Sequence, residues 1–286
     1  MTEQLQKKVD FAIKLIQSAS KKASESGQPL EVCYSGGKDS DVILELTKMA
    51  DVPYRAIYKD TTIDPPYTKQ HCIENGVEIH RPKHTFFELV RKRGFPTRRA
   101  RFCCSELKEY KILDYAILGI RRCESVKRAA RYKEPEMCRV YNKKEKTRQY
   151  FPILEWTDND VATFVKEHNI QCHPLYYSDS TTPPPKKFRV NQRLGCICCP
   201  LQGDNGLSDF KKYPNMVKAW CDSGQQWLDS HPNAKSNRNF SDVYELFVHN
   251  VFYNSYEDFK NVVTDNLFGK GLNCKTFLEN YFNIKF

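Results

Sequence analysis

The stretch EVCYSGGKDS, residues 31–40, decides the fold prediction for this chain. An apolar run ends at Cys33, and an amphipathic helix pattern follows from Asp39. The paired glycines between them let backbone N–H groups approach an anion closely, and the start of a helix adds partial positive charge. Lys38 adds a mobile cation. The segment therefore predicts a phosphate-binding loop where a strand gives way to a helix.

Strand and helix patterns alternate over about the first 170 residues. We expect strands at 30–33, 54–58, 77–80, 115–120 and 150–154, and helices at 4–24, 39–49, 68–75, 85–92, 104–111 and 158–168. Strands separated by helices of this length predict an α/β fold with a doubly wound, mainly parallel sheet and helices on both faces. Ligands of such sheets bind at the carboxyl ends of the strands, where the loop lies.

The pattern changes along the chain and suggests three parts. Residues 1–27 form an N-terminal helix, residues 28–202 form the α/β domain, and residues 203–286 form a small C-terminal helical region. Helix patterns rich in aromatic residues cover 209–227, 242–251, 256–267 and 275–282, whereas residues 177–187, with three consecutive prolines, predict a loop.

Composition restricts the class of protein. Of the 286 residues, 40% are hydrophobic and 28% are charged, which is ordinary for a globular protein. No apolar run approaches the roughly 18 residues that a membrane span needs. With no signal-peptide core at the N-terminus, we expect a cytoplasmic protein without membrane contact. Twelve cysteines in such a chain indicate metal or redox chemistry rather than a disulfide framework.

The positive charge is concentrated in one segment. The net charge is +10, and residues 81–150 alone sum to +13. A solvated basic face explains part of this excess. A segment so basic more readily serves a polyanion, either a phosphorylated nucleotide or a nucleic acid backbone.

The cysteines form two groups. Cys103 and Cys104 are adjacent, and Cys196 and Cys199 form a C-x-x-C about ninety residues later. Four thiolates of this kind can bind one metal ion or one cluster. A tetrahedral all-cysteine Zn²⁺ site fits the same donors, and Cys198 is an alternative to either of its neighbours as a ligand.

These motifs carry a family resemblance. The hexapeptide SGGKDS resembles the pyrophosphate-binding loop of the adenine nucleotide alpha-hydrolases, which include the N-type ATP pyrophosphatases. The segments RFCC at 101–104, GIRR at 119–122 with Arg128, and RLGCICCP at 193–200 follow in the order seen in the phosphoadenylylsulfate (PAPS) reductase family. The resemblance covers residues 28–202.

The resemblance implies a set of site residues. Lys38, Asp39, Arg121 and Arg128 would be catalytic, with Asp39 a candidate Mg²⁺ ligand and the arginines clamping phosphate or sulfate oxygens. The nucleotide would contact Ser35, Gly36, Gly37, Lys38, Asp39, Ser40, Asp60 and Thr61. Cys103, Cys104, Cys196 and Cys199 would hold a [4Fe–4S] cluster, as in the cluster-bearing members.

Three functions remain open at this stage. The first is an ATP pyrophosphatase that acts at the α-phosphate, with Mg²⁺, in sulfur transfer to a nucleic acid or another acceptor. The second is a reductase of PAPS or adenylylsulfate that uses Cys274 or an external thiol. A protein that donates sulfur or electrons is an expected partner of either enzyme. The chain lacks the Glu-Cys-Gly-[Leu/Ile]-His motif of those reductases, and only Cys274 lies near the expected place. The third is a zinc-stabilised nucleic-acid-binding module.

Overall fold

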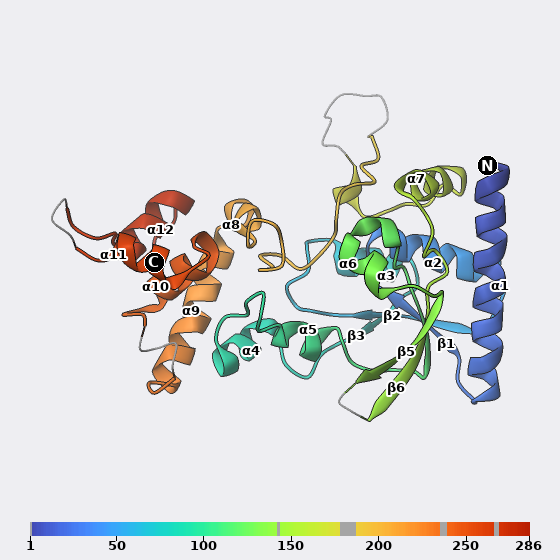
Figure 1. Cartoon of the computed structure of the whole chain (residues 1–286), viewed down its shortest axis with the longest axis horizontal. Helices are drawn as coiled ribbons and strands as arrows, with labels where there is room; N and C mark the ends of the chain where they lie inside the picture. Colours follow the sequence, from blue (N-terminus) through green and yellow to red (C-terminus); the bar gives the residue numbers. More distant parts are fainter. Residues whose placement is uncertain (1, 142–143, 178–186, 235–238, 266–268) are drawn as a thin grey trace. The chain divides into compact units, whose positions relative to one another are not determined.

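The computed structural model describes residues 2–141, 144–177, 187–234, 239–265 and 269–286 (Figure 1). The chain divides into two compact units, which we describe separately. Unit 1 comprises Met1–Asp60, Pro65–Arg81 and Lys108–Gly195, and unit 2 comprises Thr61–Asp64, Pro82–Leu107 and Cys196–Phe286. Most of the loop predicted over 177–187 lies outside the described residues. The three-part division at residues 27 and 202 stays a prediction.

Unit 1 is built on a six-stranded sheet with the strand order β3-β2-β1-β4-β6-β5. The strands are β1 (Leu30–Tyr34), β2 (Tyr54–Lys59), β3 (Glu78–His80), β4 (Tyr115–Leu118), β5 (Glu136–Tyr141) and β6 (Glu145–Tyr150). Every neighbouring pair is parallel except β5 and β6, which form an antiparallel hairpin at the edge of the sheet. The first strand, β1, is therefore central and flanked by parallel neighbours.

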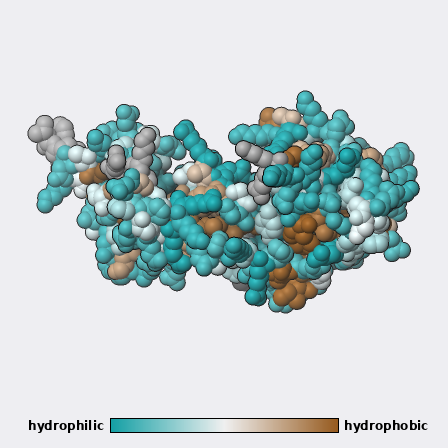
Figure 2. Space-filling view, turned by 90° about the horizontal axis from the view of Figure 1, so that it is seen from below, coloured by the Kyte–Doolittle hydropathy of each residue, from teal (hydrophilic) through white to brown (hydrophobic). Residues whose placement is uncertain are grey.

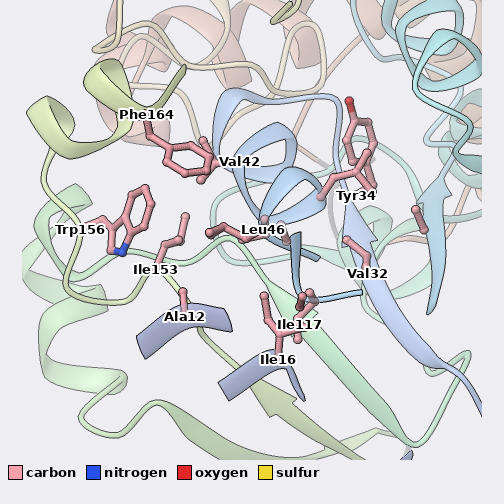
Figure 3. Close-up of a cluster of buried hydrophobic side chains, with 14 of the residues drawn as sticks. Ala12, Ile16, Val32, Tyr34, Val42, Leu46, Ile117, Ile153, Trp156 and Phe164 are labelled. Atoms are coloured by element: carbon pink, nitrogen blue, oxygen red, sulfur yellow. The ribbon is translucent and has the colours of Figure 1, made fainter. Parts of the chain in front are cut away.

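An aliphatic core covers one face of this sheet. The helices of unit 1 are α1 (Glu3–Glu25), α2 (Lys38–Met49), α3 (Thr68–Glu74), α6 (Val126–Arg131) and α7 (Asp158–Glu167), with 3-10 turns η1 (Arg122–Glu124) and η2 (Pro174–Tyr176). Helix α1 begins because the Thr2 side chain accepts a hydrogen bond from the backbone N–H of Leu5. Its buried stripe packs with β1, α2 and α7, as Figure 3 shows for Ala12, Val32 and Phe164.

The strand expected at 150–154 is wrong. The last strand of the sheet is β6, which ends at Tyr150, and the chain then turns, with Leu154 N donating to Phe151 O. Apolar residues 150–154 are buried as a turn rather than as a strand. Hairpin β5–β6 was not predicted, because its charged residues obscure the apolar alternation that marks a strand. Helix α6 was not predicted either, because it is short and has no buried residue that would give a helical apolar pattern.

Unit 2 has helices around an aromatic core. They are α4 (Phe86–Arg93), α5 (Phe102–Leu107), α8 (Leu207–Lys212), α9 (Asn215–Ser230), α10 (Val243–Phe252), α11 (Tyr256–Val263) and α12 (Cys274–Phe282). The helix expected over 209–227 is two helices, because Pro214 cannot continue α8 and instead stands before α9. Helix α4 carries a capping box, in which Thr85 and Glu88 bind each other's backbone N–H.

The predicted fold class is confirmed, with a mainly parallel sheet, helices around it and C-terminal helices. None of the helices in the described part of the chain is long and apolar enough to cross a membrane. The face drawn in Figure 2 is mostly hydrophilic, with a few separate hydrophobic patches. Phe11, which is 52% exposed, is among the large apolar side chains that face solvent.

Candidate phosphate site and cysteine cluster

The loop between β1 and α2 has the backbone of an anion site. Gly36 has a φ of +76°, and a Cβ at that position would lie 2.9 Å from Thr68 Cγ2. Gly37 is the N-cap of α2 and makes no side-chain capping bond among the described residues. The backbone N–H of Ser40 donates to Gly37 O at 2.8 Å, and that of Lys38 bonds the Tyr176 hydroxyl. Phosphate binding by this loop therefore stays a prediction.

A cavity of about 210 Å³ lies against this loop. Its lining includes Ser35, Gly37, Lys38, Asp39, Ser40 and Arg128, all of which the sequence indicated. It also includes Cys33, Gly119, Glu124, Tyr176, Arg193 and Leu194, which were not predicted as site residues. The cavity is smaller than those that enclose a whole drug-sized ligand.

Asp39 stands between two cations. Its Oδ2 lies 2.9 Å from Lys38 Nζ, and its Oδ1 accepts a hydrogen bond of 2.8 Å from Arg121 Nε. Arg121 is only 1% exposed and does not line the cavity, and its Nη2 lies 2.8 Å from Asp158 Oδ1. Burial alone would lower the pKa of Arg121, but Asp39 and Asp158 raise it. The guanidinium therefore stays charged and fixes the orientation of Asp39.

Arg128 brings positive charge to the cavity itself. Its guanidinium binds the carboxylate of Glu124, which also lines the cavity. Burial and the nearby charge of Arg193 lower the pKa of Arg128. Two guanidinium groups this close repel each other, and an anion between them relieves the repulsion. Glu124 neutralises part of this charge, so the cavity is polar and positively biased.

Two further residues shape the cavity. A Cβ on Gly119 would lie 2.7 Å from the backbone O of Asp39, so only glycine lets the chain after β4 pass this close to the loop. The Tyr176 ring centroid lies 5.6 Å from Lys38 Nζ, a cation–π distance. Gly119 begins the GIRR motif of the family resemblance, but neither it nor Tyr176 was predicted as a site residue.

Asp60 and Thr61 are not among the residues that line this cavity. Asp60 in unit 1 is 4% exposed, and its Oδ2 lies 2.7 Å from Lys69 Nζ. Thr61 belongs to unit 2, where its N–H donates to Asp64 Oδ2 at 3.1 Å. Their assignment to the nucleotide stays a prediction.

The four predicted cysteine ligands gather within unit 2. Cys103 and Cys104 lie on α5, and Cys196 and Cys199 flank a turn whose Ile197 N–H donates to Ile63 O at 2.8 Å. A hydrogen bond with Cys104 and burial raise the pKa of Cys103, and the charges of Cys104, Cys196 and Cys199 raise it further. The four thiols are therefore near enough to interact electrostatically.

Cys198 faces different surroundings from its neighbours. It is 0% exposed with a φ of +58°, and its N–H donates to Asp209 Oδ2 at 2.9 Å. A Cβ on Gly206 would lie 2.7 Å from its backbone carbon. Burial and the charges of Asp209 and Cys199 raise its pKa, and neither Cys103 nor Cys104 contributes. The packing thus favours Cys196 and Cys199 over Cys198 as partners of the earlier pair.

The thiols are donors of the type that thiophilic metals bind, but they are not arranged as a complete metal-binding site. Among the described residues, no group of three or more His, Cys, Asp or Glu has an arrangement that would hold a metal ion. Closely spaced thiols, such as the three that raise the pKa of Cys103, are nonetheless the donor set that a metal cation or cluster stabilises as thiolates.

Comparisons with known proteins agree with the motifs. Residues 29–202 match the family model of the phosphoadenosine phosphosulfate reductase domain. The chain is 27% identical over 237 residues to an uncharacterized protein of Methanocaldococcus jannaschii. This match covers 77% of this chain and 53% of that protein. It is 26% identical over 200 residues to sulfate adenylyltransferase subunit 2 of Shewanella frigidimarina. That match covers 54% of this chain and 62% of that subunit.

Among solved structures, the chain is similar to the phosphoadenylyl-sulfate reductase of Candida auris in a phosphate complex. The TM-score is 0.40 at 16% sequence identity, and the match covers 63% of this chain and 94% of that one. The chain spans about half the length of the first curated relatives that it matches.

Proposed function

Because the chain belongs to the phosphoadenosine phosphosulfate reductase family, we propose that it binds an adenine nucleotide through its phosphates at the Ser35–Ser40 loop. We further propose that it acts at the α-phosphate of ATP, as an ATP pyrophosphatase, in sulfur transfer. The observation that carries the proposal is the cavity that the Ser35–Ser40 loop lines together with Arg128 and Arg193. That combination suits a polyphosphate.

The chemistry is an in-line displacement at phosphorus. An oxygen of the acceptor attacks the α-phosphorus of ATP, the bond to the bridging oxygen breaks, and pyrophosphate leaves with the electron pair. The adenylylated acceptor is then open to attack by sulfur, which displaces AMP. Lys38 and Arg128 neutralise charge on the phosphates, and the Ser35 hydroxyl donates a hydrogen bond to them, whereas the Ser40 hydroxyl donates to Gly37 O and supports the turn. Asp39, oriented by Arg121, is the residue that would hold Mg²⁺.

We also propose that Cys103, Cys104, Cys196 and Cys199 bind a [4Fe–4S] cluster, with Zn²⁺ as the alternative. The support is the electrostatic effect of Cys104, Cys196 and Cys199 on Cys103, together with the four-thiol donor set. Such a cluster would supply a site for binding or activating sulfur. Anaerobic purification, metal analysis and the absorbance near 400 nm test this assignment, because iron–sulfur proteins are coloured and zinc proteins are not.

The reductase alternative lacks a suitable nucleophile. Cys274, at the start of α12, is 4% exposed, and burial raises its pKa to about 12. A buried thiol of this kind is almost wholly protonated near neutral pH, so it does not attack a sulfonucleotide. Sulfite release from PAPS or adenylylsulfate with an added thiol would favour the reductase over the pyrophosphatase.

Nucleic acid is the acceptor that the charge distribution favours. The exposed residues Arg91, Lys92, Arg99 and Arg101 precede the Cys103–Cys104 pair in unit 2. The decisive assay incubates the full chain with ATP and Mg²⁺ and measures pyrophosphate against orthophosphate, with and without DNA or tRNA. Pyrophosphate release that rises with nucleic acid supports the proposal. Failure to bind any adenine nucleotide overturns it, and zinc with nucleic acid binding alone would indicate the binding module.

A further inference from the structure

Unit 1 contains a second cavity, of about 470 Å³, more than twice the volume of the cavity at the loop. It lies between the first turns of α1 and the segments around η1 and after β6. Its lining comprises Gln4, Lys7, Lys8, Phe11, Arg122, Lys133, Pro135, Pro152, Leu154, Glu155 and Trp156. None of these residues lines the cavity at the loop. The volume is within the range of cavities that hold small ligands.

The body of this second cavity is apolar. Pro135, Pro152, Leu154 and Trp156 contribute carbon surface from the segments beside the sheet edge. Phe11 contributes an aromatic ring from α1 and is 52% exposed, unlike the residues of the stripe that packs α1 into the core. Since exposed aromatic surface is costly in water, a ligand with its own apolar body gains free energy by covering this ring.

The rim of the cavity is cationic. Lys8 is held by Asp160 Oδ2 at 2.6 Å, and the Arg122 guanidinium binds the Glu155 carboxylate. The ion pair of Lys7 is with Glu3, and both side chains are more than 70% exposed, so the pair holds Lys7 weakly. Lys133 forms no ion pair with the residues that the structure describes. Two ammonium groups thus remain for an anionic head group.

The cavity wall is also the backbone that supports the phosphate loop. Arg122 N donates to Leu154 O at 2.9 Å, which joins the two wall segments. On the neighbouring residues, Arg121 Nη1 and Cys123 Sγ lie 3.5 and 3.2 Å from Trp156 O. Arg121 is the residue that binds Asp39. Hydrogen-bonded main chain therefore fixes the segments around Arg122, Leu154 and Trp156, which carry one wall of the cavity.

We propose that this cavity binds a small amphipathic organic anion. The ligand carries an aromatic or branched apolar body, which lies against Phe11, Leu154 and Trp156. It carries one carboxylate, sulfonate or phosphate group, which Lys133 and Lys7 bind. A polyphosphate nucleotide does not match this lining, because its charge far exceeds what two exposed ammonium groups neutralise and its body is polar.

The test titrates the full chain, without nucleotide, with 8-anilinonaphthalene-1-sulfonate, an anion of this class that fluoresces when its rings leave water. We expect one saturable site per chain. Phe11→Ser and Lys133→Glu should each weaken binding about tenfold, which corresponds to about 1.4 kcal/mol. Both residues are exposed, so the variants should fold, and circular dichroism checks this.

Matched control variants make the result specific to the cavity. Ile73→Ser removes another exposed apolar side chain of unit 1, 60% exposed on α3, and Lys14→Glu reverses another exposed charge on α1. Neither residue lines the cavity, so neither variant should change the affinity. Non-saturable binding, or equal loss in the control variants, would mean scattered surface binding only and would overturn the proposal. Because no nucleotide is present, this outcome is independent of the proposed ATP chemistry.

Discussion

Unit 1 and unit 2 differ in the composition of their hydrophobic cores and in how the chain brings together the residues of their candidate sites. The core of unit 1 is mainly aliphatic, and its candidate site is a main-chain turn at the end of a central strand, oriented by buried ion pairs such as Arg121–Asp39. The core of unit 2 is aromatic and helical, and its thiols come from two segments far apart in the sequence. A local motif thus fixes the first site, whereas the second depends on how distant segments pack.

The largest expected effect is on the aromatic core of unit 2. Phe247 is 0% exposed, and its ring lies 5.0 Å from that of Phe210 and 6.5 Å from that of Trp220. Phe247→Ala should lower the free energy of unfolding by about 3–5 kcal/mol, because the cavity it leaves cannot be filled. Denaturant unfolding followed by tryptophan fluorescence measures this loss. Ile73→Ala, at an exposed position, should change it by less than about 0.5 kcal/mol.

The second-largest expected effect is the loss of ATP affinity when Lys38, the cation of the loop, is removed. Lys38→Ala should weaken ATP binding about 100-fold, because a charged donor to the phosphates is lost from a buried position. Calorimetric titration with ATP and Mg²⁺ measures the dissociation constant. Lys48→Ala is the matched control on the same helix, since Lys48 is exposed and pairs with Glu45. Equal affinity in the two variants would mean that the nucleotide binds elsewhere.

The thiols of unit 2 can be separated by substitution. Cys104→Ser should reduce bound iron or zinc about tenfold, since one of four ligands is lost. Cys198→Ser should keep the metal, because Cys198 packs against Asp209 and Gly206 rather than beside the α5 thiols. Elemental analysis of anaerobically purified protein measures the iron or zinc bound by each variant. Cys138→Ser, at an exposed position, is the control. Metal loss in Cys198→Ser alone would reverse the ligand assignment.

The fold was predictable where one segment decides its own structure. The run before Cys33, the glycine pair and the helix after it contain the whole strand–loop–helix signal, and β1 and α2 lie where it predicts. Hairpin β5–β6 was missed, because its pairing depends on a sheet edge that the local sequence does not reveal. The strand expected over 150–154 failed for a related reason, since burial in a turn and burial in a strand give the same apolar run.

The candidate site was predictable in its loop and less so around it. Gly119, Tyr176 and Arg193 reach the cavity from segments far from the loop. Gly119 and Arg193 belong to the family motifs GIRR and RLGCICCP, but neither motif by itself indicates which of its residues line the cavity. A glycine directly after a buried parallel strand, as at Gly119, is the one signal that could have been used. The grouping of the four thiols was expected from the family resemblance, whereas their exact arrangement depends on contacts such as Ile197 N to Ile63 O.

A buried histidine beside the loop should make unit 1 sensitive to acid. His173 Nδ1 accepts a hydrogen bond from Leu175 N, and Nε2 lies 3.1 Å from Pro66 O, so the neutral ring is the form that fits. Burial and the charge of His71 lower its pKa to about 4.

In the unfolded chain the pKa of such a ring is about 6.5, so the unfolded state binds more protons between pH 6.5 and 4. The neutral His173 ring therefore contributes its full stabilisation of the folded state above about pH 6.5, and this contribution is lost as the pH falls toward 4. We expect a loss of about 1–2 kcal/mol, smaller than the full shift implies, because part of the ring can relax toward solvent. His173→Gln should flatten the dependence measured by denaturant unfolding from pH 7 to 4. The exposed His231→Gln should leave it unchanged, and a steep curve in both would assign the acid sensitivity to other groups.

The smallest expected effect tests whether ion pairs position the loop. Asp158→Asn removes a charge that binds Arg121 but touches no residue of the cavity, and Asp158 is 48% exposed, so its influence is screened. Arg121 would then hold Asp39 less firmly, and the Mg²⁺ concentration for half-maximal pyrophosphate release should rise about threefold, with kcat at saturating Mg²⁺ almost unchanged. General destabilisation would lower kcat instead. Asp10→Asn, at an exposed position on α1, is the control, and an unchanged Mg²⁺ requirement in Asp158→Asn would mean that Asp39 is oriented without this outer pair.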